Sequence, residues 1–150
     1  MDTAELENFL YRARAKTYAA DGEKVKALLA GSDQLEYAEG DWLYRDVYYT
    51  GQNNFTGLEA IYYQDKPVFS MCYYGNWGTM TEAEIDAILQ GALRANPETR
   101  TYKPIKWEKD GFFYDCSPDT DSFDEVSGSE VITKDGERVY YLYYAGSVLV

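Results

Sequence analysis

Two stretches of the chain, each 19 residues long, can be laid over each other without a gap. They are GLEAIYYQDKPVFSMCYYG at 57–75 and GSEVITKDGERVYYLYYAG at 128–146. In both, β-branched and aromatic residues flank a polar turn, which is typical of a β-hairpin. The Asp135-Gly136 turn suits type I′ geometry. Six positions are identical: Gly57/Gly128, Glu59/Glu130, Ile61/Ile132, Val68/Val139, Tyr73/Tyr144 and Gly75/Gly146.

An amphipathic helix is expected ahead of each hairpin region. The first begins at the capping residue Asp2 and covers residues 3 to about 17, with apolar residues at i, i+3, i+4 and i+7. The second begins at Thr81 and ends before Pro97. Each capping residue is followed three positions later by glutamate, the spacing of a capping box.

Strand and turn signals complete a repeated pattern. A strand with two aspartates five residues apart precedes each hairpin, as DWLYRD at 41–46 and DGFFYD at 110–115. The order of helix, aspartate strand and hairpin favours an internal duplication of an α-βββ unit, with repeat one at about 3–75 and repeat two at about 81–146. A chance likeness of two hairpins is the alternative. Strands are expected near 35–39, 41–49, 57–64, 67–75, 105–108, 111–116, 125–134 and 137–146.

The expected fold is therefore α+β, a mostly antiparallel sheet with two helices. A chain of 150 residues with 45% hydrophobic content suits a single domain over 1–150. How the two repeats pack stays open, because an edge strand of each half could pair with the other half or with a second copy in a homodimer.

The charge balance narrows the class of partner. The chain has 14 Lys and Arg against 26 Asp and Glu, a formal net charge of −12. Such a field repels phosphate backbones, so we expect no direct binding to nucleic acid. It favours a cationic ligand, a basic protein partner or simply solubility.

Several kinds of chemistry lack their usual residues. The chain has no histidine and only two cysteines, Cys72 and Cys116, so neither a metal site nor another cofactor is expected. Both cysteines lie in apolar, strand-like surroundings, where a small buried thiol is the usual role. The first residues indicate a helix instead of an apolar leader, and no apolar run spans about 18 residues. We therefore expect a cytoplasmic protein that is not inserted in a membrane.

Matched carboxylates are the main candidates for a ligand site. Glu59 and Glu130 share a strand face with isoleucine and valine, where a charge is costly unless it is paired. One hypothesis is that they receive an amine or another cation in an aromatic cavity. The alternative is that they pair with Arg45, Lys134 or Arg138 near a sheet rim. Asp46 and Asp115 lie mid-strand among aromatics and could converge as general acid and base, but no nucleophile or phosphate-loop motif supports catalysis.

Tyrosines supply the aromatic part of the candidate site. Alternation predicts Leu58, Met71 and Tyr73 on one face of the first hairpin, and Glu59 with Tyr74 on the other. Stripes of tyrosine are commonly core or interface, and the alternative is cation–π contact with a ligand. The tyrosine candidates for that contact are Tyr73, Tyr74, Tyr141, Tyr143 and Tyr144.

A further set of residues carries a family resemblance. It consists of Thr17-Tyr18, Leu35-Glu36-Tyr37, Glu39-Gly40, Tyr44, Asp46, Tyr48, Gly51, Phe55, Gly57, Glu59, Pro67-Val68, Met71 and Tyr73-Tyr74-Gly75. With these residues the chain, over roughly 6 to 146, resembles a bacterial family of domains of unknown function that occur alone or behind a Cro/repressor-type helix-turn-helix. The resemblance implies no assigned activity, and through the fused architecture it implies a regulatory or sensing role in some members.

Three functional interpretations follow. The first is a module that binds or senses a small molecule, which could be cationic. The second is an acidic interaction module that docks a basic protein. The third, for which the sequence gives least support, is a carboxylate-dependent enzyme, and it requires Asp46 with Asp115, or Glu59 with Glu130, to face one cleft.

Overall fold

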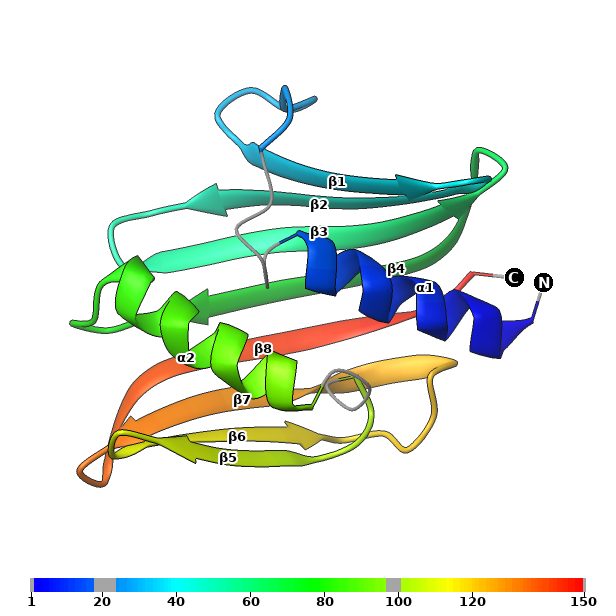
Figure 1. Cartoon of the computed structure of the whole chain (residues 1–150). Helices are drawn as coiled ribbons and strands as arrows, with labels where there is room; N and C mark the ends of the chain where they lie inside the picture. The colour runs from blue at the N-terminus through cyan, green and yellow to red at the C-terminus, as the bar shows by residue number, and fades with distance from the viewer. Residues whose placement is uncertain (1, 18–23, 97–100, 150) are drawn as a thin grey trace.

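The computed structural model describes residues 2–17, 24–96 and 101–149, which form two helices and eight strands (Figure 1). The α+β class predicted from the sequence is confirmed, and each strand overlaps its expected range. The helices are α1 (Thr3–Lys16) and α2 (Glu82–Ala95). The strands are β1 (Asp33–Glu39), β2 (Trp42–Thr50), β3 (Asn54–Tyr63), β4 (Lys66–Asn76), β5 (Ile105–Lys109), β6 (Phe112–Pro118), β7 (Glu125–Lys134) and β8 (Glu137–Val148).

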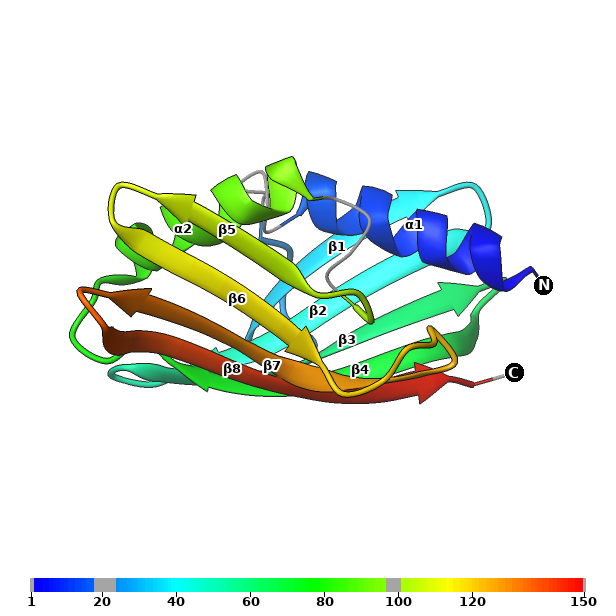
Figure 2. The ribbon, with the colours of Figure 1, turned by 90° about the horizontal axis from the view of Figure 1, so that it is seen from below.

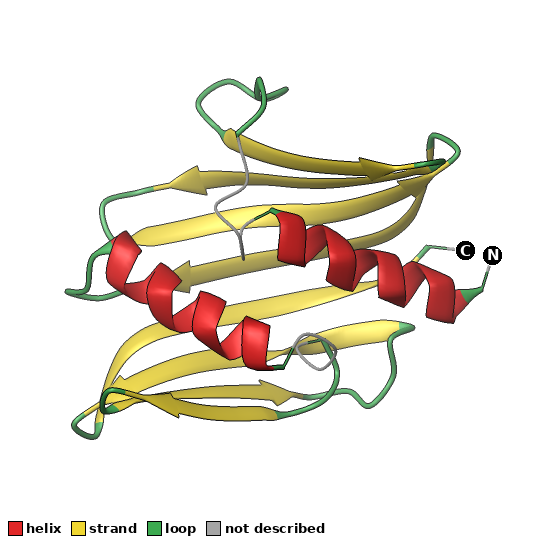
Figure 3. Cartoon of the chain, in the orientation of Figure 1, coloured by secondary structure: helices red, strands yellow, loops and turns green. Residues whose placement is uncertain are grey.

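All eight strands belong to one antiparallel sheet in the order β1-β2-β3-β4-β8-β7-β6-β5. Figure 3 shows the two four-strand halves meeting at the middle of the sheet, where β4 pairs with β8. The predicted α-βββ unit was one strand short, because each helix is followed by four strands. The additional strands, β1 and β5, lie at the two edges of the sheet. The order reads alike from both edges, and the duplication itself stays a prediction.

Both helices cover the same face of the sheet, which curves around them (Figure 2). We call the covered face the inner face and the opposite one the outer face. The capping residue of α1, Asp2, accepts a hydrogen bond from the Ala4 amide at 3.1 Å. The predicted capping box of α2 is present, since Thr81 and Glu84 each accept from the other's backbone amide.

The core lies between the helices and the inner face. On α1 the predicted apolar stripe, which includes Leu6 and Phe9, is fully buried. The Phe9 ring stacks on Trp42 of β2, with the ring centroids 5.2 Å apart. On α2, Ile85 and Ile88 are buried in the same cluster. Burial of these stripes, at about 25 cal/mol per Å² of apolar surface, stabilises the helices on the sheet.

A β-bulge in each hairpin corrects the predicted strand faces. Regular pairing around the first turn would place Leu58 opposite Met71, but the register shifts next to Ile61 and Met71 lies opposite Glu59 instead. The second hairpin shifts next to Ile132 in the same way, so that Glu130 lies opposite Leu142. Since side chains alternate between faces, each one-residue shift moves β4 and β8 to the other face relative to β3 and β7.

The cysteines differ in exposure. Cys116 of β6 is fully buried, as predicted, but Cys72 of β4 is exposed. The prediction for Cys72 was wrong because an apolar strand sequence does not show which face of the sheet the helices leave uncovered.

Candidate functional site

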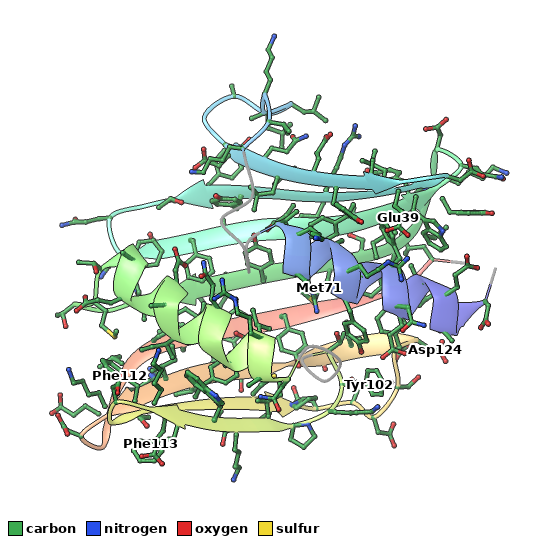
Figure 4. All side chains as sticks on the ribbon, in the orientation of Figure 1. Glu39, Met71, Tyr102, Phe112, Phe113 and Asp124 are labelled. Atoms are coloured by element: carbon green, nitrogen blue, oxygen red, sulfur yellow. The ribbon has the colours of Figure 1, made fainter. Side chains whose placement is uncertain are left out.

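A cavity of about 330 Å³ lies between the inner face of the sheet and the two helices. We call it the central cavity. Met71, labelled in Figure 4, is one of the residues that line it from β4. The described residues of the lining are Arg14, Lys24, Leu35, Asp46, Tyr48, Thr50, Phe55, Glu59, Met71, Tyr73, Trp77, Ile85, Asp86, Leu89, Glu130, Tyr140, Leu142 and Tyr144. A mostly apolar lining with a few polar groups is usual for a small-molecule site.

A buried ion pair joins α1 to the wall of this cavity. The Arg14 guanidinium lies 2.5 Å from Oε2 of Glu59, and the two side chains are only 7% and 5% exposed. Arg14 also donates to Thr101 Oγ1 at 3.1 Å, and Tyr44 donates to Glu59 Oε1 at 2.9 Å. Both carboxylate oxygens of Glu59 therefore accept hydrogen bonds from the protein.

Electrostatics favour the charged state of Arg14. Burial by itself lowers the pKa of Arg14, but the Glu59 carboxylate, helped by Tyr44 and Glu130, outweighs this effect and leaves the pKa raised. A charge buried on α1 is thus balanced by groups on three strands of the inner face. The pair holds α1 against β3 in the first half of the sheet.

Asp46 has a different environment. Its Oδ1 accepts a hydrogen bond from the Tyr73 hydroxyl at 2.6 Å. Among the described residues, no other group donates to the Asp46 side chain, although Asp46 is only 5% exposed and lines the cavity. Burial, followed by the negative charge of Glu59, raises the pKa of Asp46 to about 7, against the Tyr73 hydrogen bond and Arg14, which lower it.

A glycine makes room for the Tyr73 side chain. Gly57 of β3 lies opposite Tyr73 of β4, and a Cβ at Gly57 would lie 2.4 Å from the Tyr73 hydroxyl oxygen. Gly128 and Tyr144 have the same relationship in the second half, where the corresponding distance is 2.6 Å. Tyr144 donates there to the backbone carbonyl of Thr101 at 3.2 Å.

The structure brings five of the eight predicted site residues together. The residues that line the central cavity are Glu59, Glu130, Asp46, Tyr73 and Tyr144. Glu130 is 2% exposed. The ion-pair alternative named the wrong cations for Glu59, because its partner is Arg14 and not Arg45, Lys134 or Arg138.

The other three predicted residues lie outside the cavity. Tyr74 and Tyr141 form a cluster with Tyr143 on the outer face, where the Arg138 guanidinium lies 4.6 Å from the Tyr141 ring centroid. Asp115 has a side chain 43% exposed and also belongs to the outer face. The bulges beside Ile61 and Ile132 place Tyr74 and Tyr141 on the face opposite to the one predicted for them.

A single-residue offset explains Asp115. In the sheet Asp46 pairs with Glu59, whereas the residue that pairs with Glu130 is Cys116. The residue equivalent to Asp46 is therefore Cys116, and the neighbouring Asp115 points to the opposite face. Asp46 and Asp115 cannot converge on one cleft, although Glu59 and Glu130 do share the central cavity.

Sequence reasoning missed Arg14 and the residues of the cavity that come from α2. Arg14 lies four positions after Leu10, on the buried stripe of its helix, and this spacing was the signal that could have found it. Ile85 and Leu89 of α2 lie on the apolar stripe of an expected amphipathic helix, a pattern that predicts core packing and not a cavity wall. A charged residue on an apolar stripe indicates a buried partner.

No metal site emerges from the described part of the chain. No group of three or more Cys, Asp or Glu side chains there is arranged to hold a metal ion. Likewise, neither described helix has the length and apolar character needed to cross a membrane.

The protein is of the α+β class, with two helices over one face of a curved antiparallel sheet and a cavity of ligand size between them. The chain belongs to the family described as a domain of unknown function (DUF5680), whose model matches residues 46–149. The matched segment includes Asp46, Glu59 and Glu130, and it lacks Arg14. Neither the curated proteins nor the solved structures gave a match.

Proposed function

We propose that this domain binds a small molecule in the central cavity and acts as a binding or sensing module. The observation that carries the proposal is the cavity itself, about 330 Å³ in volume and lined by residues of the sheet and of both helices. Ligand cavities typically measure about 300–1,000 Å³, so this one suits a small ligand. Buried polar groups beside apolar walls would fix the orientation of such a ligand.

Aromatic walls support a ligand with an apolar part. Phe55 of β3 stacks on Trp77 with centroids 5.4 Å apart, and both line the cavity. Leu89 approaches from α2. Because residues of the helices and of both sheet halves line one space, a bound ligand would contact elements far apart in the sequence. That arrangement would couple binding to the packing of the helices, as a sensor requires.

A sensing role, as distinct from ligand binding alone, rests on the resemblance to bacterial domains that occur behind a helix-turn-helix. A regulatory role, a cytoplasmic location and pairing with a second copy of the chain agree with the proposal and stay predictions.

The other two interpretations have less support. The interpretation that the domain docks a basic protein rests on the net charge of −12, which points to no particular surface. Catalysis by Glu59 and Glu130 is disfavoured because the Glu59 carboxylate is already occupied by Arg14 and Tyr44. A general acid or base must reach a proton of its substrate.

Thermal unfolding against a panel of compounds tests the proposal. The panel contains amines, sugars, organic anions and neutral aromatics, and the protein is the wild type beside Leu89→Trp, which fills the cavity from α2. Ligand at about 100 times its dissociation constant adds roughly 2.7 kcal/mol to the unfolding free energy. We expect at least one class to raise the Tm of the wild type and not that of the folded variant.

Two results would overturn the proposal. One is a panel in which no class raises the Tm of the wild type. The other is a rise that is equally large in Leu89→Trp, which would place binding outside the cavity. A substitution at Leu58, on the outer face, is the matched control and should leave any rise unchanged.

A further inference from the structure

We propose that the ligand carries a protonated amine on an apolar body and that Asp46 binds its ammonium group. This inference rests on the proposed function and names the chemical class of the ligand. It is carried by three features of the central cavity: the balance of buried charge, the hydrogen bonds of each carboxylate, and the position of the aromatic wall.

Buried charge beside the first half of the sheet is unbalanced. Among the described residues there, one buried guanidinium, that of Arg14, interacts with two buried carboxyl groups, those of Asp46 and Glu59. Carboxylates are costly to bury without compensating cations. A ligand with one positive charge would offset this excess, whereas an anionic ligand would increase it. Lys24, the other cation among the described lining residues, pairs with Asp33 at 3.0 Å and has a side chain 53% exposed.

Asp46 has capacity for a ligand that Glu59 lacks. Glu59 accepts from Arg14 and Tyr44 on both of its oxygens. Asp46 lines the cavity and accepts from Tyr73 on Oδ1 alone, so its Oδ2 has no donor among the described residues. An ammonium N–H donated to Oδ2 would form a charge-assisted hydrogen bond, which is stronger than one between neutral groups.

The apolar wall is suitably placed for the body of the ligand. Phe55 and Trp77 are stacked with an interplanar angle of 10° and line the same cavity as Asp46. Leu89 of α2 also lines it. A flat hydrocarbon group can pack against these side chains, and aromatic faces also attract a nearby ammonium group.

The second half of the sheet lacks this recognition point. The position equivalent to Asp46 is Cys116, whose sulfur lies 3.9 Å from the Tyr144 hydroxyl. Among the described residues the second half of the sheet therefore has no aspartate at the position equivalent to Asp46, which favours a ligand with a single ammonium group over a polyamine.

Binding of the amine would release a proton. Asp46 is partly protonated near neutral pH because its pKa is raised to about 7 by burial and by Glu59. The carboxylic acid loses its proton to solvent, and the resulting carboxylate pairs with the ammonium ion. Affinity should therefore rise between about pH 5 and about pH 8, below the pKa of the amine. Asp46 interacts electrostatically with Glu59 of β3, Tyr73 of β4, Arg14 of α1 and Tyr44 and Tyr48 of β2. The other titratable or charged residues described in the cavity lining are Lys24, Asp86, Glu130, Tyr140 and Tyr144.

Isothermal titration calorimetry with three matched probes tests the inference. The probes are phenethylamine, phenethyl alcohol and hydrocinnamate, which share an aromatic body and differ in charge. The proteins are the wild type, Asp46→Asn, Tyr73→Phe and the matched control Asp115→Asn, which removes the same charge from the outer face. Folding of each variant is checked by circular dichroism.

We expect phenethylamine to bind the wild type and Asp115→Asn most tightly. Loss of the charged acceptor in Asp46→Asn should weaken it by about 10- to 100-fold, and in buffers of different ionisation enthalpy the wild type should release protons. Tyr73→Phe keeps the carboxylate and should therefore bind the amine more tightly than Asp46→Asn does.

Three results would overturn the inference: phenethyl alcohol or hydrocinnamate binding as tightly as phenethylamine, equal affinity for the amine in Asp46→Asn and the wild type, or no binding of phenethylamine. If phenethyl alcohol or hydrocinnamate binds as tightly as phenethylamine and this binding is lost in Leu89→Trp, the cavity still binds a ligand, and only its preference for an amine is refuted. The thermal panel described above tests separately whether the cavity binds any small molecule.

Discussion

Arg14 of α1 and Glu59 of β3 form an ion pair that is almost completely buried, with 2.5 Å between the guanidinium nitrogen and the carboxylate oxygen. The two residues are 45 positions apart in the chain. Their contact ties the first helix to the third strand at the wall of the central cavity. It also removes Glu59 from the groups that are available to a ligand.

Replacing Arg14 by methionine should destabilise the fold severely. The substitution leaves the Glu59 carboxylate buried without its cation, which typically costs about 3–5 kcal/mol. Urea unfolding measures the loss. Arg12→Met is the matched control, because Arg12 pairs with Glu39 at the surface, where the side chains are 46% and 45% exposed. Such a pair contributes at most about 1 kcal/mol, so equal losses in the two variants would contradict the prediction.

The pKa of Asp46, raised to about 7, predicts a specific pH dependence. The native state holds the Asp46 proton more tightly than the unfolded chain, in which the pKa is about 3.9. The stabilisation from Asp46 is therefore complete below about pH 4 and is lost as the pH rises to about 7.

As the pH rises from about 4 to about 7, the unfolding free energy of the wild type should therefore fall relative to that of Asp46→Asn. The slope can reach about 1.4 kcal/mol per pH unit. Denaturant unfolding at a series of pH values measures it. Asp115→Asn is the control, and the same shift in that variant, or none in Asp46→Asn, would refute the assignment.

The two cysteines should react at very different rates. Cys72 is exposed on the outer face, and Cys116 is fully buried beneath the helices. A thiol reagent needs access to the sulfur, so native protein should show one fast thiol and one that reacts only on unfolding. Cys72→Ser should abolish the fast phase. If the fast phase survives in Cys72→Ser, the placement of β4 is incorrect.

Gly57→Ala should disturb the Tyr73–Asp46 hydrogen bond. The new methyl group would lie 2.4 Å from the Tyr73 ring and hydroxyl, so the tyrosine must move. Such overpacking usually costs about 1–3 kcal/mol. In a double-mutant cycle, Tyr73→Ala removes the clash, so the double variant should be more stable than additivity predicts. Additive losses would show that the two residues do not meet as described.

Much of the secondary structure could be predicted because its signals are local. Asp2 and Thr81 mark the starts of both helices, and the Asp135-Gly136 turn marks a hairpin, since capping and turn geometry depend on residues a few positions apart. The candidate site was predicted only in part. Glu59 and Glu130 were found because a charge among apolar strand residues has few stable explanations.

The sequence by itself determined the helices, the strands and the presence of matched glutamates. The tertiary structure decided which side chains meet. Bulges beside Ile61 and Ile132 changed the faces of Tyr74 and Tyr141, and a one-residue offset put Asp115 on the face opposite Asp46. The physical reason is that strand side chains alternate with a period of two, so a one-residue change in register reverses every later contact. A one-residue shift in register leaves little trace in the local sequence, so the residues at the shift do not reveal it.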